Sequence, residues 1–166
     1  MKENLRLWML RVKLLSAINK QGGSQGMNFV DKILDQIDSL SAYEVIYSIG
    51  KNIYDDPLEE QLLSSYPQFM QDIFYIIYFD DGLSMGGILS VLESEATRIY
   101  IPSIIISLYN IGAEHDAEIL NQIYNKHKID IDDESIEILG DKLYLYNDVN
   151  IWIMLEKYVE LKKQHM

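Results

Sequence analysis

Apolar residues recur every three or four positions along most of the chain, which is the spacing that one face of an α-helix requires. Phe29, Val30, Ile33, Leu34 and Ile37 form the first such stripe after residue 26. Later stripes predict helices over 41–53, 69–79, 85–95, 102–111, 113–128, 130–139 and 148–164. We therefore expect an all-α protein, folded as a single-domain compact helical bundle of about 8–10 helices.

Helix start and stop signals frame these stripes. Ser41 followed by Glu44 has the form of a capping box, and Asp56-Pro57-Leu58-Glu59 repeats that form with proline at the first helical position. Gly112 is expected to end the helix over 102–111, and Asp80-Asp81-Gly82 the helix over 69–79. Two stretches rich in Ile and Tyr, 74–79 and 99–106, have a strand-like composition. Neither has a hairpin turn nearby, so both are interpreted as buried helices.

The glycine-rich run over 21–26 divides the chain. It ends the first helix, so residues 1–21 are expected to form an N-terminal amphipathic helix or arm, and residues 27–166 an acidic helical domain. The apolar stripe of the arm comprises Leu5, Trp8, Met9, Val12 and Leu15. Such a stripe packs against the domain or lies on a membrane surface. Its apolar run is interrupted by charges, so no membrane span is expected there.

Charge is distributed unevenly along the chain. The net charge is −12, but residues 22–156 alone carry 6 basic and 24 acidic residues, a net −18, between two basic ends. A surface of this kind repels phosphate, so direct nucleic-acid binding is not expected. We instead expect a basic protein partner. The chain contains no cysteine, which agrees with a cytoplasmic location and excludes disulfides and thiolate metal sites.

No motif of an active site or cofactor site is complete. His115 and His127 lie twelve residues apart, about 18 Å along one helix, which is too far to share a metal ion. The acidic run from Asp130 resembles the opening of a calcium loop, but Ser135 stands where that loop requires glycine. The segment over 82–87 lacks the Gly-Lys-Ser/Thr ending of a phosphate loop. We therefore expect no catalytic residues, no metal and no cofactor.

Two segments resemble a known family. Residues 81–92 contain the pair Gly86-Gly87, and residues 108–120 begin Leu-Tyr-Asn-Ile-Gly-Ala, with Gly112 in the motif. Together they resemble a bacterial helical family of unknown function that includes a DNA-mimic protein. The resemblance extends over about residues 27–160. Met85 and Ile88 stand where that family has Asn and Phe, which marks this chain as a distant relative.

The resemblance implies a protein partner rather than a reaction. The studied member of that family acts as a dimer whose carboxylates imitate DNA phosphates and capture a transcription factor, so a homodimer is also implied. The three glycines are structural and carry no function of their own. The candidate partner-binding carboxylates are those of Asp80, Asp81, Glu114, Asp116, Glu118, Asp130, Asp132, Asp133 and Glu134.

The functional hypothesis is therefore a non-enzymatic acidic protein-binding domain that acts as a DNA mimic toward a basic DNA-binding protein. Two alternatives stay open at this point. One is an immunity or toxin-neutralising interaction protein, for which an acidic helical surface would also serve. The other is an enzyme with an unrecognised carboxylate site, which would require a pair of close, buried carboxylates.

Overall fold

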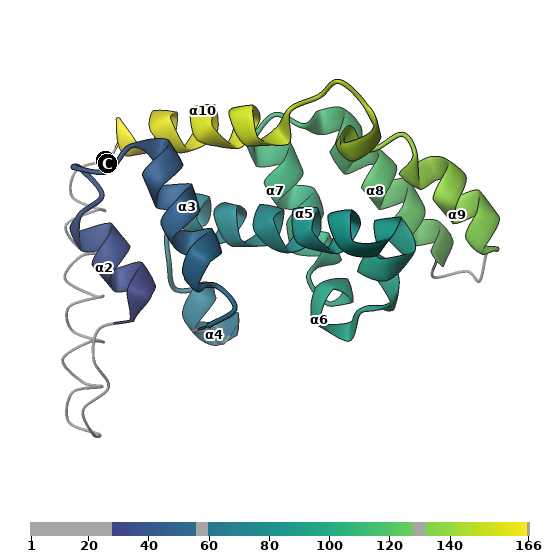
Figure 1. Ribbon diagram of the computed structural model, residues 1–166, viewed down its shortest axis with the longest axis horizontal. Helices are drawn as coiled ribbons and strands as arrows, with labels where there is room; N and C mark the ends of the chain where they lie inside the picture. The colour runs from purple at the N-terminus through teal and green to yellow at the C-terminus, as the bar shows by residue number, and fades with distance from the viewer. Residues whose placement is uncertain (1–27, 56–59, 128–131, 166) are drawn as a thin grey trace.

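The computed structural model describes residues 28–55, 60–127 and 132–165, and every regular element in these ranges is a helix (Figure 1). The all-α prediction is therefore confirmed. The elements are α2 (Phe29–Asp35), α3 (Ala42–Asn52), α4 (Glu60–Leu63), α5 (Gln68–Glu93), α6 (Glu95–Arg98), α7 (Ile101–Asn110), α8 (Glu114–His127), α9 (Asp133–Gly140), the 3₁₀-helix η1 (Tyr144–Tyr146) and α10 (Ile151–Lys163).

Helix α5 is the central element of the bundle. Its 26 residues contact α3, α6, α7, α9 and α10, and α10 lies above it in the view of Figure 1. From Phe69 to Phe79 nearly every side chain is buried, whichever way it points. A helix that is apolar all round is stable only when neighbours cover all its faces, so the other helices are arranged about α5.

The break in this helix lies further along the chain than its sequence predicted. We expected the helix over 69–79 to end at Asp80-Asp81-Gly82, but α5 continues through Gly82 and bends at Gly86 and Gly87. A single glycine costs a helix only about 1 kcal/mol, which burial of the flanking residues offsets. Gly87 has φ 71° and ψ −168°, a combination that is essentially restricted to glycine, so the helical geometry is interrupted there.

Other start and stop signals are confirmed. The Ser41 side chain accepts from the Glu44 N–H and the Glu44 carboxylate accepts from the Ser41 N–H, which completes the capping box of α3. Gly112 has φ 88° beyond the end of α7. The N–H groups of Gly112 and Ala113 donate to the carbonyls of Tyr109 and Leu108, so two of the last carbonyls of α7 are satisfied.

The core consists of the faces that the apolar stripes predicted. Val45, Ile46, Ile49 and Ile53 of the second stripe are all buried. The strand-like stretches over 74–79 and 99–106 lie in α5 and largely in α7, so their interpretation as helices is confirmed.

Three predictions fall on other parts of the chain. The arm over 1–21, the Asp56-Pro57 start signal and Asp130 lie outside the described residues. Within the described ranges, no helix is both long enough and apolar enough to cross a bilayer.

Candidate functional site: an acidic surface on α8 and α9

The exposed carboxylates of α8 and α9 follow the helical repeat. Glu114 and Glu118 lie one turn apart on α8, and Asp133, Glu137 and Asp141 lie at successive turns along and just beyond α9. Four residues of an α-helix rise about 6 Å. Every second phosphate along one strand of duplex DNA lies about 6.8 Å further along its axis. In each row, negative charges therefore recur at nearly the spacing of every second phosphate along a DNA strand.

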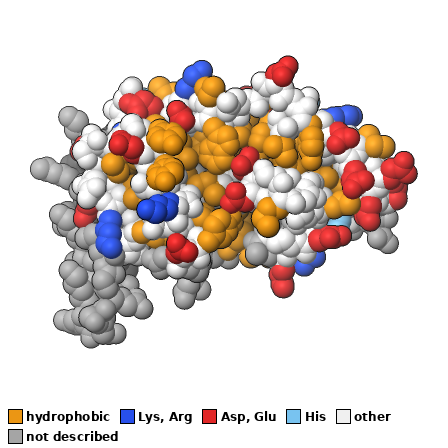
Figure 2. Space-filling model, in the orientation of Figure 1, with side chains coloured by type: hydrophobic (Ala, Val, Ile, Leu, Met, Phe, Trp, Pro, Cys, Tyr) orange, Lys and Arg blue, Asp and Glu red, His pale blue; other side chains and the backbone are white. Residues whose placement is uncertain are grey.

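The two rows belong to neighbouring helices, because α8 and α9 pack against each other and α9 also packs on α5. Asp132 and Glu134 add two further exposed carboxylates at the start of α9. We call these seven exposed carboxylates the α8–α9 acidic surface, which comprises Glu114, Glu118, Asp132, Asp133, Glu134, Glu137 and Asp141. Figure 2 shows acidic side chains gathered over α9 at the right-hand end of the molecule.

One carboxylate of this surface has a local structural role. Asp132 is the N-cap of α9, and its side chain accepts from the N–H and the hydroxyl of Ser135 at 2.9 and 3.0 Å. These hydrogen bonds lower the pKa of Asp132, because they stabilise its ionised form. The start of α9 therefore keeps its negative charge to lower pH than an ordinary aspartate.

The structure removes Asp116 from any partner surface, although it was predicted as a candidate. Asp116 is only 2% exposed, and its carboxylate accepts from the Tyr144 N–H at 2.7 Å. A helical repeat explains this position, since Asp116 follows Glu114 by two residues and faces the opposite side of α8. Burial raises the pKa of Asp116, against the lowering effect of the Tyr144 hydrogen bond.

Asp80 and Asp81 are half-buried and already have partners. The Tyr144 hydroxyl donates to Asp80 at 2.8 Å, and the Tyr54 hydroxyl donates to Asp81 at 2.5 Å. Burial raises the pKa of Asp80. Burial and the neighbouring carboxylates raise the pKa of Tyr144 far above its ordinary value, so that hydroxyl remains a donor. These two aspartates connect η1 and the end of α3 to α5, and they are not members of the rows on α8 and α9.

Sequence reasoning missed two members of the acidic surface. Glu137 and Asp141 were not among the candidates, yet both are exposed. The signal that would have found them is their spacing of four and eight residues from Asp133, which places all three on one helical stripe.

Sequence reasoning also missed a fully buried carboxylate in α5. Asp72 is 0% exposed and accepts hydrogen bonds from Ser107 at 2.8 Å, Tyr158 at 2.5 Å, Gln68 at 3.0 Å and Asn110 at 3.2 Å. The signal that would have found Asp72 is the presence of an acidic residue in the otherwise apolar run that follows Gln71. All four donors are neutral, and they come from α5, α7 and α10, so Asp72 joins three helices.

The described residues contain no group of three His, Cys, Asp or Glu side chains placed to hold a metal ion. His115 and His127 are both on α8, near its two ends. Gly86 and Gly87 lie at the bend of α5 and Gly112 at the end of α7, where each has a backbone role.

The chain is thus all-helical, and its exposed carboxylates line the adjacent helices α8 and α9. The family model described as DMP19-like protein matches residues 64–164, and the chain belongs to this family. The name of the family refers to DNA mimic protein 19, so the predicted resemblance to a family with a DNA-mimic member is confirmed. The match begins at residue 64, within the predicted span that began near residue 27. No curated protein and no solved structure shows significant similarity to the chain.

Proposed function

We propose that this protein is a non-enzymatic DNA mimic whose α8–α9 acidic surface binds the DNA-binding face of a basic protein. The observation that carries the proposal is the repeat of exposed carboxylates at about 6 Å along two packed helices. Membership of the DMP19-like family supports the same class of function.

Charge balance over the two helices supports this choice of surface. Within the described parts of residues 113–142, the basic side chains are Lys126 and Lys142, against seven exposed carboxylates. A surface with such an excess attracts a cationic partner and accelerates its association. The buried Asp116 takes no part, because it is paired with the backbone of Tyr144.

Capture from a bacterial lysate tests the proposal. The immobilised chain is compared with a variant in which five surface carboxylates are neutralised: Glu114→Gln, Glu118→Gln, Asp133→Asn, Glu137→Gln and Asp141→Asn. A matched control neutralises five exposed carboxylates elsewhere: Asp35→Asn, Asp38→Asn, Asp55→Asn, Glu93→Gln and Asp148→Asn.

The wild-type chain and the control variant are expected to retain a basic DNA-binding protein that duplex DNA elutes. The α8–α9 variant is expected to lose it. Retention should also fall between about 0.1 M and about 1 M salt, where the Debye length decreases from about 10 Å to about 3 Å. Equal capture by the α8–α9 variant would refute the proposed surface, and capture that resists both salt and DNA would refute mimicry.

A further inference from the structure

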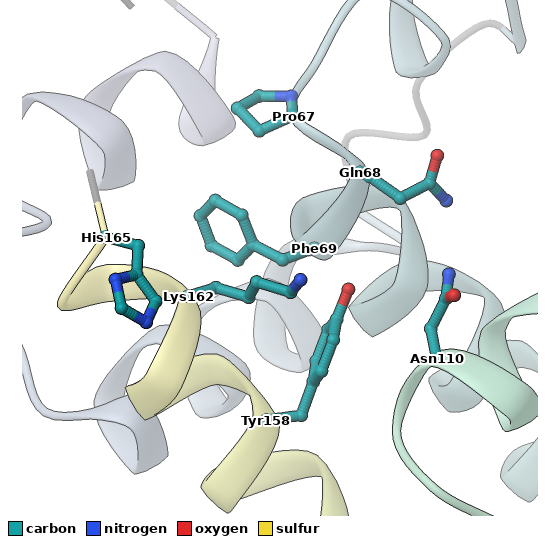
Figure 3. A pocket seen from close by; sticks show the side chains of 7 residues that line it. All are labelled: Pro67, Gln68, Phe69, Asn110, Tyr158, Lys162 and His165. Atoms are coloured by element: carbon teal, nitrogen blue, oxygen red, sulfur yellow. The ribbon is translucent and has the colours of Figure 1, made fainter. Parts of the chain in front are cut away.

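A small pocket opens where the start of α5, the end of α7 and the end of α10 meet (Figure 3). Its volume is about 280 Å³, slightly below the range of about 300–1,000 Å³ that is usual for ligand pockets. The lining residues are Pro67, Gln68, Phe69, Asn110, Tyr158, Lys162 and His165. No carboxylate is among them, although the chain as a whole carries a net charge of −12.

The α10 wall of the pocket is basic. Tyr158, Lys162 and His165 lie at positions i, i+4 and i+7, so their side chains share one stripe. The Lys162 ammonium lies 5.2 Å from the centre of the Tyr158 ring, and in Figure 3 the Lys162 side chain runs between that ring and Phe69. The ion pair within the described part of α10 joins Lys163 to Glu160, which leaves the Lys162 ammonium available to an anion. This wall suits a carboxylate.

The opposite wall is formed by two side-chain amides that bind Asp72. Gln68 and Asn110 direct their side-chain N–H groups to this buried carboxylate, at 3.0 and 3.2 Å. Because these N–H groups are engaged with Asp72, the amide oxygens remain as hydrogen-bond acceptors. This wall therefore suits a hydrogen-bond donor such as an ammonium group. Pro67 and Phe69 supply the apolar part of the lining.

We propose that the pocket binds a small zwitterion that carries a carboxylate and an ammonium group beside a short apolar side chain, as a free apolar amino acid does. The carboxylate pairs with Lys162 and accepts a hydrogen bond from the His165 ring. The ammonium group donates to the Gln68 and Asn110 amide oxygens, and the side chain packs on Phe69. The hydrogen bonds to Asp72 hold both amides and Tyr158 in place before the ligand arrives, which lowers the entropic cost of binding.

The test is a ¹H–¹⁵N correlation titration of the full chain with L-leucine. Saturable shifts are expected in the side-chain amide signals of Gln68 and Asn110. N-acetyl-L-leucine lacks the ammonium group and L-leucinamide lacks the carboxylate, so each is expected to bind at least about tenfold more weakly. Absence of saturable shifts at the pocket, or equal binding of either analogue, would overturn the proposal.

Two variants locate the site. Lys162→Gln is expected to weaken L-leucine binding at least about tenfold, and His165→Gln to weaken it by a smaller factor. Both residues are exposed, so neither change is expected to alter the fold, which thermal unfolding checks. Lys157→Gln is the matched control, because Lys157 is an exposed lysine of α10 outside the pocket. If the Lys162→Gln variant bound L-leucine as tightly as the wild type does, the binding site would lie outside this pocket and the proposal would be wrong.

Discussion

The hydroxyl of Tyr158 on α10 donates a 2.5 Å hydrogen bond to the carboxylate of Asp72 on α5, and that carboxylate has no contact with solvent. The two residues are 86 positions apart in the sequence. Ser107 and Asn110 of α7 donate to the same carboxylate, so one side chain holds three helices together. A buried carboxylate is costly unless its oxygens accept hydrogen bonds, and here both do.

Replacement of this carboxylate is expected to be strongly destabilising. Asp72→Ala leaves the buried Ser107 hydroxyl and its neighbours without their acceptor, so the free energy of unfolding should fall by about 3–5 kcal/mol. Tyr158→Phe removes a single donor and should cost about 1.5–3 kcal/mol. Urea denaturation measures both, and a loss below about 1 kcal/mol for Asp72→Ala would show that the network contributes little.

A close approach between α9 and α5 predicts opposite effects for two glycine substitutions. A Cβ at Gly140 would lie 2.5 Å from Cγ2 of Ile88, so Gly140→Ala should destabilise the protein by about 1–3 kcal/mol. A Cβ at Gly50 in α3 would meet its nearest neighbour, Ile77, at 3.6 Å. Gly50→Ala should therefore stabilise the protein by about 0.5–1 kcal/mol through helix propensity.

Thermal unfolding distinguishes these two outcomes. A double-mutant cycle with Ile88→Ala identifies the clash, because the loss caused by Gly140→Ala should be smaller when Ile88 is truncated. Additive losses, or equal effects of the two glycine substitutions, would contradict the close packing.

The buried Asp116 predicts a dependence of stability on pH. Burial raises its pKa above the ordinary value of 3.8, so the folded state binds more protons than the unfolded state between the two pKa values. The contribution of Asp116 to stability is therefore fully present below the lower pKa and is lost as the pH rises through the higher one. Asp116→Asn does not titrate, so its stability relative to wild type should rise with pH across this window. Urea denaturation from about pH 3 to about pH 7 measures the difference.

Glu44 provides a control, because its contribution to stability depends on pH in the opposite direction. The hydrogen bonds from the N–H and the hydroxyl of Ser41 lower its pKa, so its contribution is present above its ordinary value of 4.5 and is lost as the pH falls through the lower, folded-state pKa. Glu44→Gln should therefore lose stability relative to wild type as the pH rises. Identical pH profiles for the Asp116→Asn and Glu44→Gln variants would be incompatible with these environments.

Local signals predicted the fold where they act within one helix. The capping box at Ser41, the αL glycine at Gly112 and the stripe through Ile46 and Ile49 each depend on residues a few positions apart. The predicted end of the helix over 69–79 was wrong, because the continuation of α5 through Gly82 depends on packing by other helices. Tertiary burial outweighs the preference of a single glycine, and local patterns do not report it.

The candidate site was predictable only in part for the same reason. Exposed carboxylates at helical spacing, such as Glu114 and Glu118, can be recognised from the sequence. The partners of Asp80 and Asp116 cannot, since Tyr144 reaches them from 64 and 28 positions away. The network of Asp72 likewise joins residues up to 86 positions apart.

The measurement that tests the central claim most directly is displacement of fluorescently labelled duplex DNA from the captured basic protein, followed by anisotropy. If the α8–α9 acidic surface mimics DNA, the wild-type chain and the control variant displace the duplex. The variant neutralised at Glu114, Glu118, Asp133, Glu137 and Asp141 should need at least about tenfold more protein to do so. Simultaneous binding of the chain and the duplex, or equal displacement by the neutralised variant, would contradict the account.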